Sequence, residues 1–134
     1  MRQTAPVTTT GISRTARDRA RTELTEEIKR VARRHLAEQG SAALSLRAVA
    51  REVGMVSSAV YRYFPSRDDL LTALIIDAYD AVGERAEAVE ETGRGRTAEA
   101  RWLAVCEAVR AWALANAHEY ALIYGSPVPG YAAL

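Results

Sequence analysis

The sequence predicts an all-α protein. Apolar residues recur every three or four positions in several segments, and no segment alternates apolar and polar residues over the length of a strand. Glycines and prolines stand between these segments, where helices end. The 134 residues are 49% apolar and 26% charged, which suits one ordinary globular domain, or one small domain joined to an incomplete one.

The N-terminal part predicts a flexible arm followed by a helix. Residues 1–13 combine threonine, proline and glycine without periodicity, and the arginine-rich stretch RTARDRAR follows. We therefore expect residues 1–21 to form a flexible basic arm. From Leu24 to Leu36 apolar residues lie on one face of a helix. Gly40 is placed to end that helix, because a left-handed cap suits glycine.

Two short helices are predicted next. Ser45 can cap a helix over residues 46–53, which Gly54 ends. Ser57 opens a third helix that runs through Phe64, because the proline that follows keeps its neighbour out of the helical region. A helix-turn-helix is predicted by three residues together. They are a small residue where the two helices cross (Ala50), a glycine in the turn (Gly54) and a branched residue in the second helix (Val60). An ordinary corner between two helices of a bundle is the alternative.

Three further helices complete the prediction. Ser66 can cap a fourth helix that extends to about Glu91, since Asp69 stands three positions on, as in a capping box. The stretch TGRGRT forms a loop before a fifth helix over residues 98–117. A short sixth helix, EYALIYG, follows, and SPVPGYAAL cannot continue it. The wide apolar stripe of the fifth helix should be largely buried: Trp102, Leu103, Val105, Cys106, Val109, Trp112 and Ala113.

Charge separates the two halves of the chain. Up to Arg67 there are 13 Lys and Arg against 6 Asp and Glu, a net charge of +7. From Asp68 onward there are 5 against 11, a net charge of −6. A basic half joined to an acidic half indicates two roles, one of them binding a polyanion, although a solvated basic surface is the simpler alternative.

The third predicted helix carries residue types suited to DNA. Near its start, side chains such as Ser57 can meet base edges or phosphates, and Ala59 can touch a thymine methyl group. Arg62 can reach a guanine edge or a phosphate, and the hydroxyls of Tyr61 and Tyr63 can reach phosphates. Each tyrosine could instead pack in the core, Tyr63 by bracing the first helix. The predicted contacts from this helix are Ser57, Ser58, Ala59, Tyr61, Arg62 and Tyr63.

The stretch LSLRAVAREVGMVSSAVYRYFPSRDDLLTAL, residues 44–74, resembles the TetR-type transcriptional regulators of bacteria. Tyr61, Tyr63 and Phe64 match the family's Tyr-x-(His/Tyr)-Phe ending, and an acid–Leu–Leu sequence follows. The resemblance covers residues 24–80. It implies that Ser45 and Arg47 approach phosphates, and Arg67 stands where the family usually carries a lysine near the DNA backbone.

The C-terminal part is similar to the family over a shorter stretch. AHEYALIYGSPVPGY resembles the sensor domain of the TetR subgroup with a Trp-His-Gly-type C-terminal region. Family members usually carry two more long helices, which form the dimer bundle and close the ligand pocket. The expected organisation is a basic arm (1–21), a DNA-binding domain (22–67) and a truncated ligand-sensing and dimerisation region (68–134). A homodimer on a palindromic operator is expected, although we also expect this chain to lack those dimer helices.

Aromatic residues in the C-terminal half predict a ligand pocket. Residues of the fifth helix recur at helical spacing, and tyrosines from the fourth and sixth helices could face them. Tyrosine hydroxyls would orient a mostly apolar effector there. The alternative is that these side chains simply form a second core. The predicted lining is Tyr79, Trp102, Cys106, Val109, Trp112, Tyr120 and Tyr124.

Other classes of protein are not favoured. His35 and His118 lie in different predicted helices, His35 as a partly exposed residue, and no spacing typical of a metal site or a phosphate-binding loop occurs. We expect no enzyme, metal or cofactor. A single cysteine and the lack of a long apolar run predict a cytoplasmic protein away from membranes.

Three hypotheses remain open. The first is a repressor that responds to a small molecule. The second is a helical module that binds small molecules or proteins without specific DNA binding. The third is a truncated relic that binds DNA weakly or constitutively. The charge separation and the tyrosine cluster favour the first hypothesis over the second.

Overall fold

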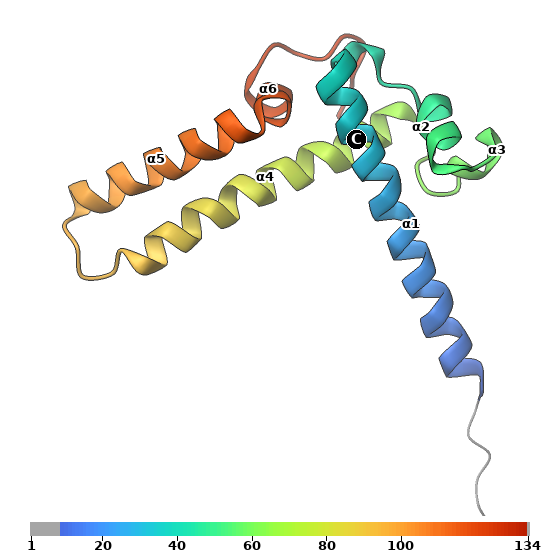
Figure 1. Cartoon of the computed structure of the whole chain (residues 1–134), viewed down its shortest axis with the longest axis horizontal. Helices are drawn as coiled ribbons and strands as arrows, with labels where there is room; N and C mark the ends of the chain where they lie inside the picture. The colour runs from blue at the N-terminus through green and yellow to red at the C-terminus, as the bar shows by residue number, and fades with distance from the viewer. Residues whose placement is uncertain (1–8, 134) are drawn as a thin grey trace, which may run out of the picture.

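The computed structural model describes residues 9–133, and the side chains of residues 14–133. This part of the chain contains helices and no strand, which confirms the predicted all-α class. Figure 1 shows α4 and α5 as a long hairpin on one side, with α6 at the end of α5, and α1 with α2 and α3 on the other side. The elements are α1 (Thr9–Gln39), η1 (Ser41–Ala43), α2 (Leu46–Val53), α3 (Ser57–Val60), α4 (Arg67–Thr92), α5 (Ala98–Ala115) and α6 (Ala117–Tyr124).

Helix α1 corrects the predicted flexible arm. It begins at Thr9, so residues 9–21 are helical, whereas residues 1–8 lie outside the described part. Residues 14–23 are all exposed, and burial therefore does not stabilise this half of the helix. Extending a helix that is already anchored costs far less than starting one, and arginine and alanine favour extension. The anchored half near Ile28 therefore supports the exposed half.

The helix-turn-helix is packed as predicted. Ser45 Oγ accepts a hydrogen bond from the Ala48 amide at 3.3 Å, and Gly54 ends α2 with a left-handed φ of 83°. Ala50 and Val60 have no exposed surface, so the small and the branched residue meet inside the core. Their cluster also holds Ile28, Val31, Ala32, Leu44, Leu46, Val49, Phe64, Leu70, Leu71, Leu74 and Val128.

Helix α3 is shorter than predicted. Its regular part ends at Val60 rather than Phe64, and Tyr61, Arg62 and Tyr63 form turns. The Tyr63 and Phe64 amides both donate to the Val60 carbonyl at 3.0 Å, which tightens the last turn before Pro65. Phe64 is still brought into the core, at 7% exposure.

Helix α4 begins at the predicted cap. Ser66 Oγ accepts a hydrogen bond from the Asp69 amide at 3.1 Å and donates one to Asp69 Oδ2 at 2.6 Å. The first of these bonds is that of a capping box, whereas the Asp69 carboxylate accepts from the Ser66 hydroxyl rather than from the Ser66 backbone amide. The carboxylates of Asp68 and Asp69 also lie in the first turn, where the helix dipole favours negative charge.

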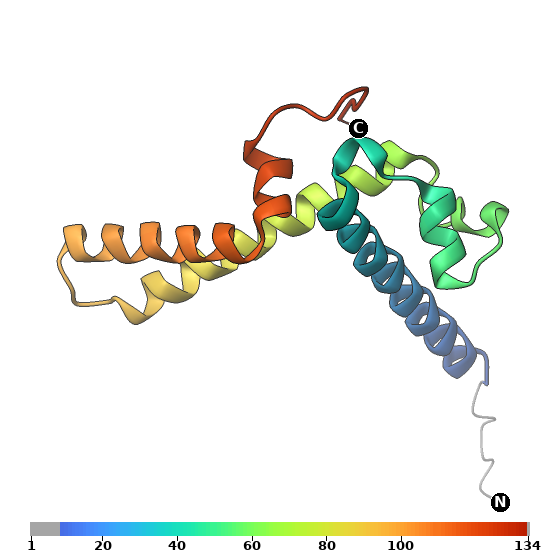
Figure 2. The ribbon, with the colours of Figure 1, turned by 45° about the horizontal axis from the view of Figure 1, so that its top comes forward.

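The C-terminal segment returns to the first core. Val128 is buried there, and Thr72 Oγ1 lies 2.8 Å from the Tyr131 hydroxyl. The Ala132 amide donates to Asp68 Oδ2 at 3.2 Å. Figure 2 shows this segment running back to the junction of α1 and α4. The predicted boundary between residues 67 and 68 is therefore not a break in the core.

Two burial predictions were wrong. Of the apolar stripe of α5 only Trp112 is buried, whereas Trp102 is 70% and Leu103 57% exposed. One face of α5 packs on α4 through Ala78 and Val82, and no described element covers the opposite face. His35 is buried rather than partly exposed, and Glu52 Oε1 of α2 lies 2.7 Å from its Nε2, so this buried nitrogen has a hydrogen-bond partner.

Candidate nucleic-acid interface

The segment from α3 to Tyr63 is anchored in the core by one buried side chain and exposes polar side chains around it. Val60 is fully buried, whereas Ser57, Ser58 and Arg62 are exposed and Ala59 is half-buried. Tyr61 exposes 42% of its surface although it follows a core residue. A rigid segment with exposed hydroxyl and guanidinium groups has the donors that DNA base edges and phosphates accept.

Sequence reasoning missed the contact that orients this segment. Arg21 of α1 donates from Nη2 to the Arg62 carbonyl at 2.9 Å, and its guanidinium lies 4.9 Å from the centre of the Tyr63 ring. Tyr63 is half-buried and also packs on the first core, which agrees with the alternative that it braces α1. The only sequence signal was the spacing of Arg21, three positions before Leu24 on the core stripe of α1.

The other predicted phosphate contacts, Ser45, Arg47 and Arg67, differ in whether their side chains are already bound within the protein. Arg47 is exposed in the first turn of α2, next to Ser45, whose hydroxyl already caps the helix. Arg67 is half-buried, and its guanidinium donates to the carbonyls of Ser41 and Leu44 at 2.8 and 3.2 Å. It also lies 3.7 Å from Asp68. Phosphate binding by these residues stays a prediction, and Arg67 has a structural role beside it.

Ion pairs connect α1 with α4 and α6. Asp77 of α4 lies 2.8 Å from Lys29 Nζ and 3.3 Å from Arg33 of α1. Arg33 also reaches Glu119 of α6, at 3.9 Å. Burial lowers the pKa of Lys29, but hydrogen bonds to Asp77 and Glu26 outweigh burial, and the net pKa is raised. Lys29 is therefore held in its charged form between the two helices.

A hollow of about 540 Å³ lies along α5 and α6. It brings together four of the predicted ligand residues, Trp102, Cys106, Val109 and Tyr120. Trp112 does not join them, since it is buried against α4. The hollow is also lined by Val105, Arg110, Ala113 and Leu114.

The remaining predicted tyrosines form an aromatic cluster beside Tyr120. The rings of Tyr79 and Tyr124 meet edge to face, with centres 6.0 Å apart. Tyr120 and Tyr124 lie 5.2 Å apart at 49°. Tyr79 and Tyr124 themselves do not line the hollow, so the structure does not bring these two predicted ligand residues to it.

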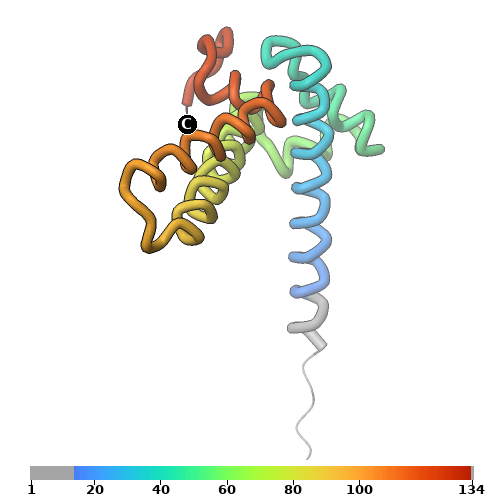
Figure 3. Tube along the Cα trace, turned by 60° about the vertical axis from the view of Figure 1, so that its left-hand side comes forward, coloured from blue at the N-terminus to red at the C-terminus, as the bar shows by residue number. Residues whose placement is uncertain are grey.

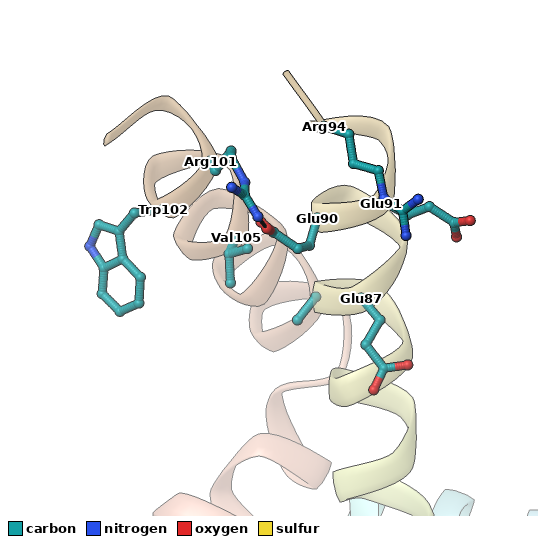
Figure 4. A pocket seen from close by; sticks show the side chains of 8 residues that line it. Glu87, Glu90, Glu91, Arg94, Arg101, Trp102 and Val105 are labelled. Atoms are coloured by element: carbon teal, nitrogen blue, oxygen red, sulfur yellow. Dashed lines mark hydrogen bonds and ion pairs between the residues drawn. The ribbon is translucent and has the colours of Figure 1, made fainter. Parts of the chain in front are cut away.

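A second hollow, of about 680 Å³, lies between the end of α4 and the start of α5. Figure 4 shows Arg101 and Glu90 meeting between the helices and the Trp102 indole pointing away from them. Glu87 and Glu91 add carboxylates to its rim. Within residues 9–133 no group of His, Cys, Asp and Glu side chains has the arrangement of a metal site.

Two family models match the chain. The model described as bacterial regulatory proteins, tetR family, matches residues 28–74. The model described as tetracyclin repressor-like, C-terminal domain, matches residues 102–134. The chain belongs to the TetR family. Proteins of this family are regulators rather than enzymes.

Named relatives of this TetR-family chain are regulators too. It is 47% identical over 116 residues to the HTH-type transcriptional regulators Rv1816 of Mycobacterium tuberculosis and Mb1846 of Mycobacterium bovis. The match covers 84% of this chain and 48% of each relative. The chain thus spans about half the length of these relatives.

A solved structure has the same fold. The crystal structure of SCO4313, described as a regulatory protein, superposes with a TM-score of 0.78 at 42% sequence identity. The match covers 87% of this chain and 55% of the other. The Trp-His-Gly-type subgroup stays a prediction for this TetR-family chain. No helix within the described residues is both long and apolar enough to span a membrane.

Proposed function

We propose that this TetR-family chain is a transcriptional repressor that binds a specific operator and leaves it when a small apolar or aromatic molecule binds. The observation that carries DNA binding is the packed helix-turn-helix, which holds exposed Ser57, Ser58, Tyr61 and Arg62 on the buried anchor Val60. As a cytoplasmic homodimer it would read a palindromic operator, because two half-sites supply more specificity than one short helix.

The proposed roles follow from position. Ser57, Ala59 and Arg62 face the major groove, where an arginine pairs with guanine through two hydrogen bonds. Tyr61 holds the phosphate backbone through its hydroxyl. The backbone of Arg62 is fixed by Arg21, so its side chain starts from a defined position. Pre-ordering of this kind lowers the entropy cost of binding.

Arg62→Ala tests base reading. The change should cost about 1–3 kcal/mol on the selected operator and relax the preference at one position, because a base-edge contact is lost. The Arg62 carbonyl that accepts from Arg21 remains, so the fold should be unaffected. The measurement is a gel shift with a duplex selected from a random-sequence library by the wild-type chain. Arg85→Ala, an exposed arginine of α4, is the control.

If Arg62→Ala lost the same affinity for the operator and for mixed-sequence DNA, Arg62 would contact a phosphate rather than read a base. Failure of the wild-type chain to select any sequence would contradict specific DNA binding itself. If the chain selected no sequence and was also not retained on heparin, the result would support the helical-module alternative, whose basic half is incidental.

The proposed sensor is the hollow on α5 and α6. Its volume of about 540 Å³ suits a small organic ligand, and Trp102, Val105 and Val109 give it an apolar wall. Arg110 and Tyr120 add polar groups that could orient the ligand. The bridge from Glu119 through Arg33 to Asp77 connects α6 with α1 and α4. A ligand that moved α6 would therefore act on helices that also carry the helix-turn-helix.

Trp102→Ala tests the sensor. A panel of planar aromatic dyes, some cationic, should contain members that raise the melting temperature of the wild-type chain and weaken its operator binding. Trp102→Ala should lose both effects, because its side chain lines the hollow. Leu103→Ala is the matched control, since Leu103 is 57% exposed on α5 but lies outside the hollow.

Two results would contradict parts of this proposal. If Leu103→Ala weakened the dye response as much as Trp102→Ala, the hollow would not be the binding site. If a dye raised the melting temperature and left operator affinity unchanged, the site would stand but the coupling would not, because linked sites must alter each other's equilibria.

A further inference from the structure

One face of α1 changes character along its length. The apolar residues that face the first core, Leu24 and Ile28, belong to a series at helical steps of three and four. Continued toward the N-terminus, the same series reaches Arg21, Arg17 and Arg14. The face is thus apolar where the domain covers it and basic where α1 extends beyond the domain.

The basic part of this face is exposed, and contacts of Arg21 fix its orientation relative to the segment of Arg62 and Tyr63. Arg14 and Arg17 are exposed, and neither forms an ion pair with another described residue. Figure 3 shows the blue part of α1, which begins at residue 14, standing clear of the other helices. Arg21 anchors the face to the DNA-reading segment, through the Arg62 carbonyl and the Tyr63 ring. Arg17 and Arg14 therefore lie on the side of α1 that touches that segment.

We propose that Arg14 and Arg17 form a second DNA-backbone contact, which binds phosphates flanking the half-site read by α3. This inference rests on the proposed function. It adds a site beyond the helix-turn-helix, built on a helix rather than on a flexible arm. A preformed helix binds with less loss of conformational entropy than an arm that must order on the DNA.

Helix geometry gives the reach of this contact. With a rise of about 1.5 Å per residue, Arg17 lies about 6 Å and Arg14 about 10.5 Å along α1 from Arg21. Duplex DNA carries one charge per about 1.7 Å of its axis, so arginines at this spacing can each meet a phosphate outside the half-site. Arg19 lies about 200° around the helix from Arg17, on the opposite face. Arg17 and Arg19 therefore allow a matched comparison, because both lie in the same exposed segment but on opposite faces.

The test compares Arg17→Gln with Arg19→Gln. Each change removes one charge from an exposed helical position and keeps a good helix former. Affinity is measured over a range of salt concentrations, on the duplex selected by the wild-type chain. Arg17→Gln should reduce the slope of log affinity against log salt by about 0.9 per chain, the value for one lost phosphate contact. Arg19→Gln should leave the slope close to that of the wild-type chain.

A second duplex, trimmed to the edges of the operator, locates the contact. On it Arg17→Gln should bind like the wild-type chain, because the flanking phosphates are absent. Circular dichroism before each titration checks that both variants keep the wild-type helicity.

Three outcomes would overturn the inference. They are equal slope changes for Arg17→Gln and Arg19→Gln, no change for Arg17→Gln, and a loss that persists on the trimmed duplex. In each case the wild-type chain would still select an operator, and the proposed function would stand. If it selected none, the proposed function would fail first, so the two failures are distinguishable.

Discussion

Leu71→Ala should lower the free energy of unfolding by about 2–5 kcal/mol, because it removes a buried side chain and leaves a cavity. Leu71 has no exposed surface, and its cluster joins α1, α2 and the first turns of α4 with Val128 of the C-terminal segment. Loss of packing there weakens both the helix-turn-helix and its attachment to α4. Urea denaturation followed by circular dichroism measures the effect.

Leu114→Ala provides the control for this prediction. Leu114 is a leucine of α5 that is 67% exposed, so its truncation should change the unfolding free energy by less than about 0.5 kcal/mol. If the two variants were equally stable, the first cluster would not be the main stabilising core. If Leu114→Ala were the more destabilised one, the exposed face of α5 would have to be covered in solution.

The helix-turn-helix could be predicted because its signals are local. Ser45, Gly54 and Ser66 each act on backbone groups within a few residues, and each stands where the structure caps or ends a helix. The extent of α1 could not be predicted in the same way. Residues 9–21 show no apolar periodicity, and their helix depends on anchorage farther along the chain.

The limits of prediction at the candidate sites have a similar cause. Periodicity identifies the apolar faces of α5 but not which face meets α4, so Trp112 and Trp102 were placed together although one is buried and the other exposed. The contact from Arg21 to the Arg62 carbonyl spans 41 positions, and the spacing of Arg21 from Leu24 gives its side of α1 but not its partner. The burial of His35 likewise depends on Glu52 from another helix.

Arg67→Ala should lower the free energy of unfolding by about 2–4 kcal/mol. Hydrogen bonds to a charged group contribute about 1.5–3 kcal/mol each, and the half-buried position of Arg67 reduces the total. The change removes the side-chain donor to the carbonyls of Ser41 and Leu44, at the connection between α1 and α2, and the Ser41 carbonyl keeps only the Leu44 amide at 3.3 Å. Urea denaturation measures this loss.

Arg67→Lys separates the structural role from a phosphate contact. A lysine keeps the charge but lacks the planar fork that reaches two carbonyls at once. If Arg67 serves mainly the carbonyls, the lysine variant should remain clearly destabilised, and the salt dependence of operator binding should match that of the wild-type chain. If Arg67 served mainly as a phosphate contact, the opposite results would be expected. Arg67→Ala would then be as stable as the wild-type chain and lose about 0.9 from the salt slope, and lysine would restore that slope. The two carbonyl contacts favour the first result, and a stable Arg67→Ala with a flattened slope would refute it.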